Sequence, residues 1–129
     1  MLKQPRVNAD PEIARAAQAI AARSERELEA LVAVSSPSGD RHGAEEALAV
    51  CGALLPDAAE VERIDCSSPD HAPDLLARVR GEGTARLLLL GHVDTVIAHS
   101  EHRPLSRVGE RLDGSCAVDH TCPVLRSLT

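Results

Sequence analysis

Apolar residues recur at helical spacing in the first quarter of the chain. They lie on one face of a predicted helix: Ile13, Ala17, Ile20, Leu28, Leu31 and Val32. Asp10 can cap the start of this helix, and Pro11 suits its first turn, where a missing N–H costs nothing. Ser24 and Glu27 have the spacing of a capping box, so we expect the helix to bend or restart there.

The segment SSPSGD, residues 35–40, predicts a break after the first helix, because Ser, Pro and Gly interrupt helices. Asp40 can cap a second helix, which should end at Pro56. Its core face would carry Ala44, Ala47, Leu48, Cys51 and Leu55.

The pattern then changes from helical to strand-like. Residues 61–64 predict a short strand, and residues 75–80 alternate apolar side chains with arginines, as a half-exposed strand does. A turn is expected at residues 81–83. Residues 105–114 predict a hairpin or a short strand pair around Gly109.

Residues 85–90, ARLLLL, show no polar alternation. Such a run predicts a central strand that is covered on both faces, with Leu87–Leu90 buried. Helices followed by strands, one of them buried, predict an α/β layered fold with a mixed sheet.

Composition narrows the class of protein. The 129 residues suit one domain or a piece of a larger one, and no aromatic residue is present to enlarge the core. A net charge of -6 without a Lys/Arg cluster argues against nucleic-acid binding. The polar start and the lack of a long apolar stretch predict no membrane contact and a cytoplasmic location, where the four cysteines would be free thiols.

His92 and Asp94 follow the leucine run. Side chains two residues apart on a strand share a face, and open α/β sheets bind ligands beyond the carboxyl ends of their strands. A metal-binding histidine usually has a carboxylate or carbonyl to orient its ring. The spacing alone fits a metal site, but it favours a solvated pair that ends a strand, because short motifs often match by chance.

Three segments occur in order: LVAVSSPSGD, LLARVRGEGTARLLLLGHVDTV and LDGSCAVDH. Together they resemble the di-zinc exopeptidases and amidohydrolases related to glutamate carboxypeptidase, acetylornithine deacetylase and succinyl-diaminopimelate desuccinylase. The resemblance runs from about Glu27 to Val118. It implies the amino-terminal part of an α/β zinc-hydrolase catalytic domain, helical over residues 10–55 and strand-rich over residues 60–114.

The resemblance also implies a function. The family hydrolyses peptide or N-acyl amide bonds near a free carboxylate, with two zinc ions that cobalt can replace. His92 would be a zinc ligand, Asp94 the catalytic residue that supports this ligand, and Asp119 the carboxylate that bridges the two ions. A small peptide or an N-acyl amino acid would be the substrate.

The third segment departs from the family's G-x-G-x-x-D-M-K-G-G pattern. Cys116 replaces a glycine, and residues 120–123 replace Met-Lys-Gly-Gly. The tail, residues 115–129, is therefore altered, and the family's glutamate pair, remaining ligands and lid or dimerisation domain would come after it. We expect an incomplete site; the alternative is a non-catalytic remnant or an interaction fragment that associates through an exposed sheet edge.

Other polar residues are expected to play no part in this site. The remaining histidines before the altered tail are predicted to be solvated: His42, His71, His99 and His102. Glu45-Glu46 is predicted to be a solvated helix face, not the missing glutamate pair. A substitute metal cluster of Cys116, His120 and Cys122 is not expected, because its spacing matches no established zinc-finger pattern.

Overall fold

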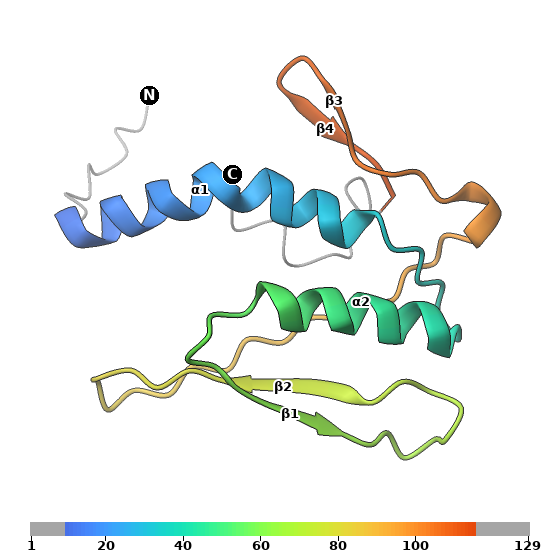
Figure 1. Cartoon of the computed structure of the whole chain (residues 1–129), viewed down its shortest axis with the longest axis horizontal. Coiled ribbons are helices and arrows are strands. Elements are labelled where there is room, and N and C mark those ends of the chain that lie inside the picture. Colours follow the sequence, from blue (N-terminus) through green and yellow to red (C-terminus); the bar gives the residue numbers. More distant parts are fainter. Residues whose placement is uncertain (1–9, 116–129) are drawn as a thin grey trace, which may run out of the picture.

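A computed structural model of the chain describes residues 10–115 (Figure 1). In this part, two helices precede two antiparallel β-hairpins, a mixed arrangement that agrees with an α/β fold at a coarse level. The elements are α1 (Pro11–Val32), α2 (Arg41–Leu54), β1 (Glu60–Ile64), β2 (Asp74–Arg78), a 3-10 turn (His99–Glu101), β3 (Ser106–Val108) and β4 (Arg111–Asp113). Figure 1 shows α2 between α1 on one side and the β1–β2 hairpin on the other.

Helix α1 begins as predicted and continues past Ser24 without a restart. The Asp10 carboxylate accepts a hydrogen bond of 2.8 Å from the Glu12 N–H, which caps the helix. The helix is continuous through Ser24, so a restart there is wrong. The hydroxyl of Ser24 donates instead to the carbonyl of Ala21, 3.0 Å away, within the helix.

The core between α1 and α2 is small. Val32, Ala47 and Leu48 are the buried hydrophobic residues in the described part, with exposed fractions of 3%, 4% and 9%. Ile13 and Ile20, on the apolar face of α1, are 65% and 44% exposed. The amino-terminal part of α1 extends beyond α2, which explains this exposure (Figure 1). Neither described helix is long and apolar enough to cross a membrane.

Helix α2 starts and ends where the sequence predicts. The Asp40 carboxylate accepts a hydrogen bond of 3.0 Å from the Gly43 N–H, and the helix ends before Pro56. Gly43 is needed at this start: a Cβ there would lie 2.6 Å from Asp40 Oδ2 and closer still to the carbonyl oxygen of Ser35. The helix thus begins in direct contact with the connection that precedes it.

The β1–β2 hairpin confirms the predicted strands near residues 61–64 and 75–80. Its register places Glu60 opposite Arg78. Ion pairs join Arg78 to Glu62 at 3.0 Å and Arg80 to Glu60 at 3.3 Å. All four side chains are more than half exposed, so this face meets solvent, as the alternation predicts.

The β3–β4 hairpin turns at Gly109, which adopts a φ of 64° that favours glycine. This confirms the predicted hairpin. Arg107 of β3 forms two hydrogen bonds with the carboxylate of Glu25 on α1. That contact ties the hairpin to the helix (Figure 1).

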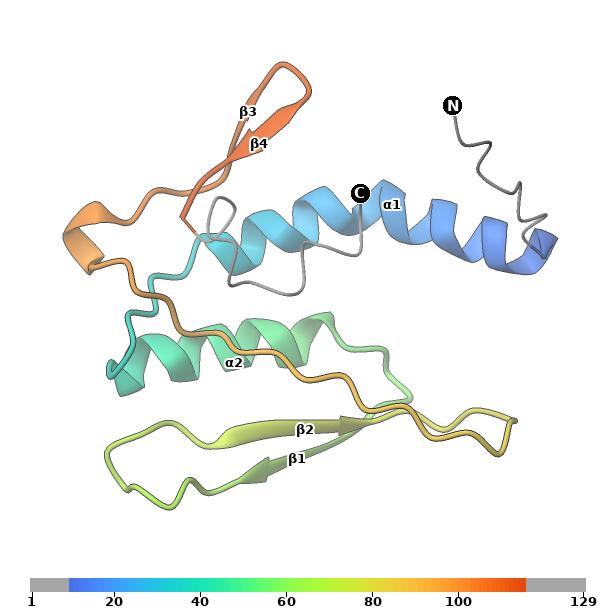
Figure 2. The same cartoon turned by 180° about the vertical axis from the view of Figure 1, so that it is seen from behind.

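The leucine run is not the buried central strand that the sequence predicts. Residues 85–90 belong to no strand, and Leu87–Leu90 are 93%, 74%, 93% and 81% exposed. Figure 2 shows this amber-coloured segment running along α2 towards the connection between the helices. An apolar run marks a segment whose burial would be favourable, but a strand is buried only where other strands lie beside it. The described residues form two separate antiparallel strand pairs instead of a mixed sheet.

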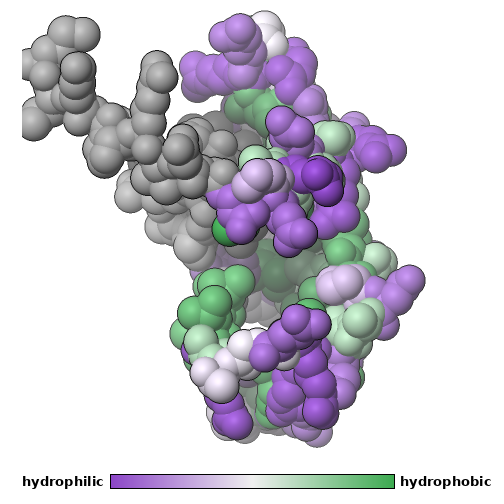
Figure 3. All heavy atoms as spheres, turned by 90° about the vertical axis from the view of Figure 1, so that its left-hand side faces the viewer, coloured by the Kyte–Doolittle hydropathy of each residue, from purple (hydrophilic) through white to green (hydrophobic). Residues whose placement is uncertain are grey.

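Hydrophobic side chains therefore remain at the surface. In Figure 3, hydrophobic groups lie uncovered beside hydrophilic ones at one end of the molecule. The exposed large hydrophobic residues outside the leucine run include Val61, Ile64, Val79, Val96 and Val108. The described part buries less apolar surface than a layered domain of this length normally does.

Candidate metal-binding site

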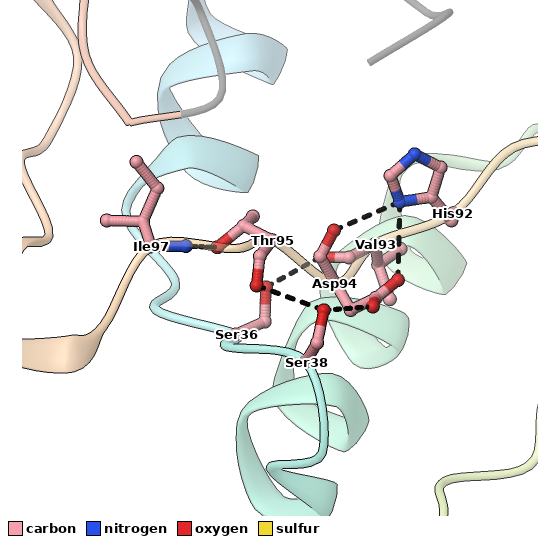
Figure 4. A network of polar contacts seen from close by, with 7 residues as sticks. All are labelled: Ser36, Ser38, His92, Val93, Asp94, Thr95 and Ile97. Carbon is pink, nitrogen blue, oxygen red and sulfur yellow. Dashed lines mark hydrogen bonds and ion pairs between the residues drawn. The ribbon is translucent and has the colours of Figure 1, made fainter. Parts of the chain in front are cut away.

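The segments 36–38 and 93–95, far apart in the sequence, meet at a junction between the helices and the leucine run (Figure 4). The Thr95 N–H donates to the Ser36 carbonyl at 2.9 Å, and the Ser38 N–H donates to the Thr95 carbonyl at 2.7 Å. The buried Ser36 hydroxyl donates to the Val93 carbonyl at 2.6 Å. These bonds form a parallel bridge that fixes the backbone on both sides of Asp94.

His92 and Asp94 contact each other, as the sequence predicts. The Nδ1 atom of His92 lies 3.0 Å from the backbone carbonyl oxygen of Asp94 and 3.2 Å from the carboxylate oxygen Oδ1 of Asp94. The hydroxyl of Ser38 donates to the other carboxylate oxygen, Oδ2, at 2.5 Å. Figure 4 shows the imidazole and the carboxylate turned towards each other above the junction.

The environment favours an ionised Asp94. The hydrogen bond from Ser38 is the main cause that lowers the pKa of Asp94, and the nearby His92 lowers this pKa further. An ionised carboxylate beside Nδ1 favours the imidazole tautomer that carries its proton on this atom. Both side chains are 47% exposed, so a metal ion could reach them from solvent.

The metal-binding capacity of residues 10–115 is limited. No group of three or more His, Cys, Asp or Glu side chains in this part could hold a metal ion. A catalytic zinc usually has three protein ligands and a water molecule. In residues 10–115, the His92–Asp94 pair offers one candidate nitrogen ligand with a carboxylate beside it. The proposed bridging residue, Asp119, lies outside the described residues, as does the Cys116–Cys122 segment.

Ser36 and Ser38 belong to the candidate site, and the sequence analysis missed them. The sequence predicts only a helix break at SSPSGD, and it gives no sign that these hydroxyls hold Val93 and Asp94. The partners are 56 and 57 residues away, so no local spacing could have revealed them.

His99 is exposed but not merely solvated. Its Nδ1 atom lies 2.8 Å from Ser35 Oγ, and its Nε2 atom lies 3.1 Å from Asp40 Oδ2. The pKa of Asp40 is lowered chiefly by the Gly43 N–H and then by the charge of His99. His99 therefore ties the loop after Asp94 to the start of α2.

Predictions for the other polar residues have mixed outcomes. His102 is half-buried, and its Nε2 atom has no hydrogen-bond partner among the described residues, so its predicted solvation is wrong. His42 and His71 are exposed, as predicted. Glu45 and Glu46 lie on α2 with their side chains 39% and 58% exposed, which confirms the solvated helix face.

The His92–Asp94 pair and its serine supports are the best-defined candidate site in residues 10–115. No protein-family model, no curated protein and no solved structure matches this chain. The assignment of a function therefore depends on the sequence motifs and on the geometry of this site.

Proposed function

We propose that the chain carries part of the metal site of a zinc-dependent hydrolase of peptide or N-acyl amide bonds. The observation that carries this proposal is the contact between His92 and Asp94, in which an ionised carboxylate orients an exposed imidazole. The three motif segments supply the reaction class by resemblance. In this proposal, the chain is the amino-terminal part of an α/β zinc-hydrolase catalytic domain.

Each residue of the site has a separate role. His92 would hold zinc through Nε2, and Asp94 would orient the ring and raise its basicity. Ser38 would fix the carboxylate of Asp94, and Ser36 the backbone beside it. A bound zinc ion would polarise the scissile carbonyl and lower the pKa of a water molecule. Asp119 would bridge to a second ion.

Asp94 is a positioning residue in this arrangement. Its two carboxylate oxygens already contact His92 and Ser38, so it is not placed to take a proton from a metal-bound water. Turnover of a small peptide or an N-acyl amino acid would therefore need a base, and further zinc ligands, from outside residues 10–115.

Cobalt titration of the chain tests the proposal, because Co²⁺ can replace zinc and absorbs visible light. The whole chain should bind Co²⁺, and His92→Ala should remove this binding. His71→Ala, which removes an exposed histidine elsewhere, should leave it intact. Asp94→Asn should weaken binding by about 10–100-fold without removing the ligand. Equal Co²⁺ spectra for the chain and for His92→Ala would refute the proposal.

The exposed leucine run favours a second candidate, an interaction role. Four adjacent leucines that are 74–93% exposed are unusual, because burying each one would yield about 1.5–3 kcal/mol. An exposed apolar segment of this kind marks a binding surface or an aggregation-prone one. Neither role excludes the other, since the leucines and the His92–Asp94 pair are different residues.

A further inference from the structure

A serine, a histidine and an aspartate meet where the chain returns from the junction to the start of α2. His99 begins the 3-10 turn, and Figure 1 shows this turn, in orange, beside the connection between α1 and α2. The Nδ1 atom of His99 lies 2.8 Å from the hydroxyl oxygen of Ser35, and its Nε2 atom lies 3.1 Å from Oδ2 of Asp40. One imidazole ring thus joins a hydroxyl group to a carboxylate through its two nitrogens.

The carboxylate of Asp40 selects the tautomer of this ring. The hydrogen bond from the Gly43 N–H is the main cause that lowers the pKa of Asp40, so the carboxylate is ionised. An ionised carboxylate beside Nε2 favours the tautomer that carries its proton on Nε2. The Nδ1 atom of His99 then has a free lone pair and accepts a hydrogen bond from the Ser35 hydroxyl.

The order of hydroxyl, imidazole and carboxylate is that of a nucleophilic serine site, which is recognised by its geometry and not by its order in the sequence. In the serine proteases Nε2 accepts the serine proton and Nδ1 faces the aspartate. The two nitrogens have exchanged places here, and this exchange leaves the chemistry unchanged, because either nitrogen of an imidazole can take a proton.

Exposure sets the class of substrate. The side chains of His99 and Asp40 are 60% and 32% exposed, and Ser35 is half-buried, so a small molecule can reach the hydroxyl from solvent. The hydrogen bonds described at the cluster join its own three residues or the start of α2, so none is directed at the oxygen of a bound carbonyl. The substrate must therefore bring a good leaving group, which an aryl ester has and an amide lacks.

We propose that Ser35, His99 and Asp40 form a nucleophilic serine site that small aryl esters acylate. The Ser35 oxygen bonds to the ester carbonyl carbon, and its proton passes to Nδ1 of His99. The bond from this carbon to the aryl oxygen breaks, the phenolate leaves, and Nδ1 releases the proton to solvent. A water molecule that gives its proton to Nδ1 then cleaves the acyl group from Ser35 as the free acid.

This site is separate from the proposed metal site. It uses neither His92 nor Asp94, and its chemistry needs no metal ion. The inference therefore does not depend on the proposed zinc function, and experiments in EDTA test it alone.

A phosphonylating probe locates the nucleophile. The whole chain in EDTA is treated with diisopropyl fluorophosphate, which bonds to a serine oxygen through phosphorus and releases fluoride. Peptide mass spectrometry then measures the rate at each serine. The control within the same chain is Ser106, an exposed serine whose hydroxyl donates to the carbonyl of Asp113. Ser35 should react about 100-fold faster, because a positioned base contributes about 10²–10⁴ in rate. Equal rates, or no modification of Ser35, would overturn the proposal.

Two variants test the roles of the partners. His99→Ala should slow the modification of Ser35 by about 100-fold, whereas His71→Ala, at an exposed histidine elsewhere, should not change it. Asp40 contacts the ring and not the ester, so it is a positioning residue. Asp40→Asn, which keeps the helix cap, should slow the reaction by about tenfold, and Asp57→Asn, with the same charge change, should leave it unchanged.

Circular dichroism confirms that each variant keeps its helices. A wild-type rate in His99→Ala would overturn the proposal, and the comparison of Ser35 with Ser106 in the wild-type chain decides the case even if a variant fails to fold.

An ester supplies the second measurement. With p-nitrophenyl acetate in EDTA, the chain should release p-nitrophenolate and carry an acetyl group on Ser35. Ser35→Ala should lose at least about nine-tenths of the catalysed release, and Ser106→Ala none of it. An acetyl group on His99 in place of Ser35, or equal release by Ser35→Ala, would overturn the proposal.

Discussion

Ser36→Ala should destabilise the chain through the junction. The wild-type hydroxyl is buried and donates a hydrogen bond of 2.6 Å to the Val93 carbonyl, which is itself part-buried. Removing it loses a hydrogen bond of about 0.5–1.5 kcal/mol and leaves a carbonyl with poor access to water. We expect a loss of about 1–2 kcal/mol in the free energy of unfolding. The change removes no apolar contact, so the loss would measure this hydrogen bond.

Urea unfolding followed by far-ultraviolet circular dichroism measures this loss, because the chain has no aromatic residue for fluorescence. With a urea dependence of about 1–2 kcal/mol per molar, the midpoint should fall by roughly 1 M. The matched control is Ser38→Ala. The Ser38 hydroxyl is exposed, so water can take its place, and the free energy of unfolding should fall by less than about 0.5 kcal/mol. A midpoint of Ser36→Ala that equals the wild type, or that exceeds Ser38→Ala, would refute the reasoning.

Gly43→Ala should lower the free energy of unfolding by about 1–3 kcal/mol, because the new methyl group would overlap the preceding connection. Gly52→Ala, in open space on the same helix, should raise this free energy by about 0.5–1 kcal/mol, and urea midpoints compare the two. The pKa of Asp40 is lower in the folded chain than in the unfolded chain, so its ionised carboxylate stabilises the fold. This stabilisation is fully present above the unfolded pKa of about 3.9 and is lost as the pH falls through the folded pKa. Asp40→Asn, which can still cap α2, should therefore reduce the loss of stability between about pH 5 and pH 2, and an unchanged acid profile would contradict this. These 129 residues alone should not hydrolyse peptides or N-acyl amino acids appreciably with zinc or cobalt added; metal-dependent turnover that His92→Ala abolishes would contradict this expectation.

Features that depend on neighbouring residues could be predicted from the sequence. Asp10 and Asp40 cap their helices because a cap needs only the next two or three N–H groups. Gly109 turns the second hairpin because its φ is set locally. The contact of His92 with Asp94 was predictable for the same reason, since two residues separate them.

Features that depend on distant residues could not be predicted. The apolar run Leu87–Leu90 fits a central strand, but its burial depends on which other segments lie beside it. Likewise, nothing near Ser36 or Ser38 in the sequence points to Val93 or Asp94. The local spacing within Ser24–Glu27 fits a cap, yet the continuing helix satisfies the Ser24 hydroxyl in another way.

The junction also governs how often the candidate site is assembled. Its few hydrogen bonds close a loop of more than 50 residues, and Ser38 and Asp94 are solvent-accessible. Closing such a loop costs conformational entropy, so the junction can open while α2 and the β1–β2 hairpin stay folded. His92 and Asp94 remain near each other in the opened state, but the carboxylate loses its serine partner. In the proposed metal site, the apparent metal affinity would then be the intrinsic affinity reduced by the fraction of molecules with a closed junction.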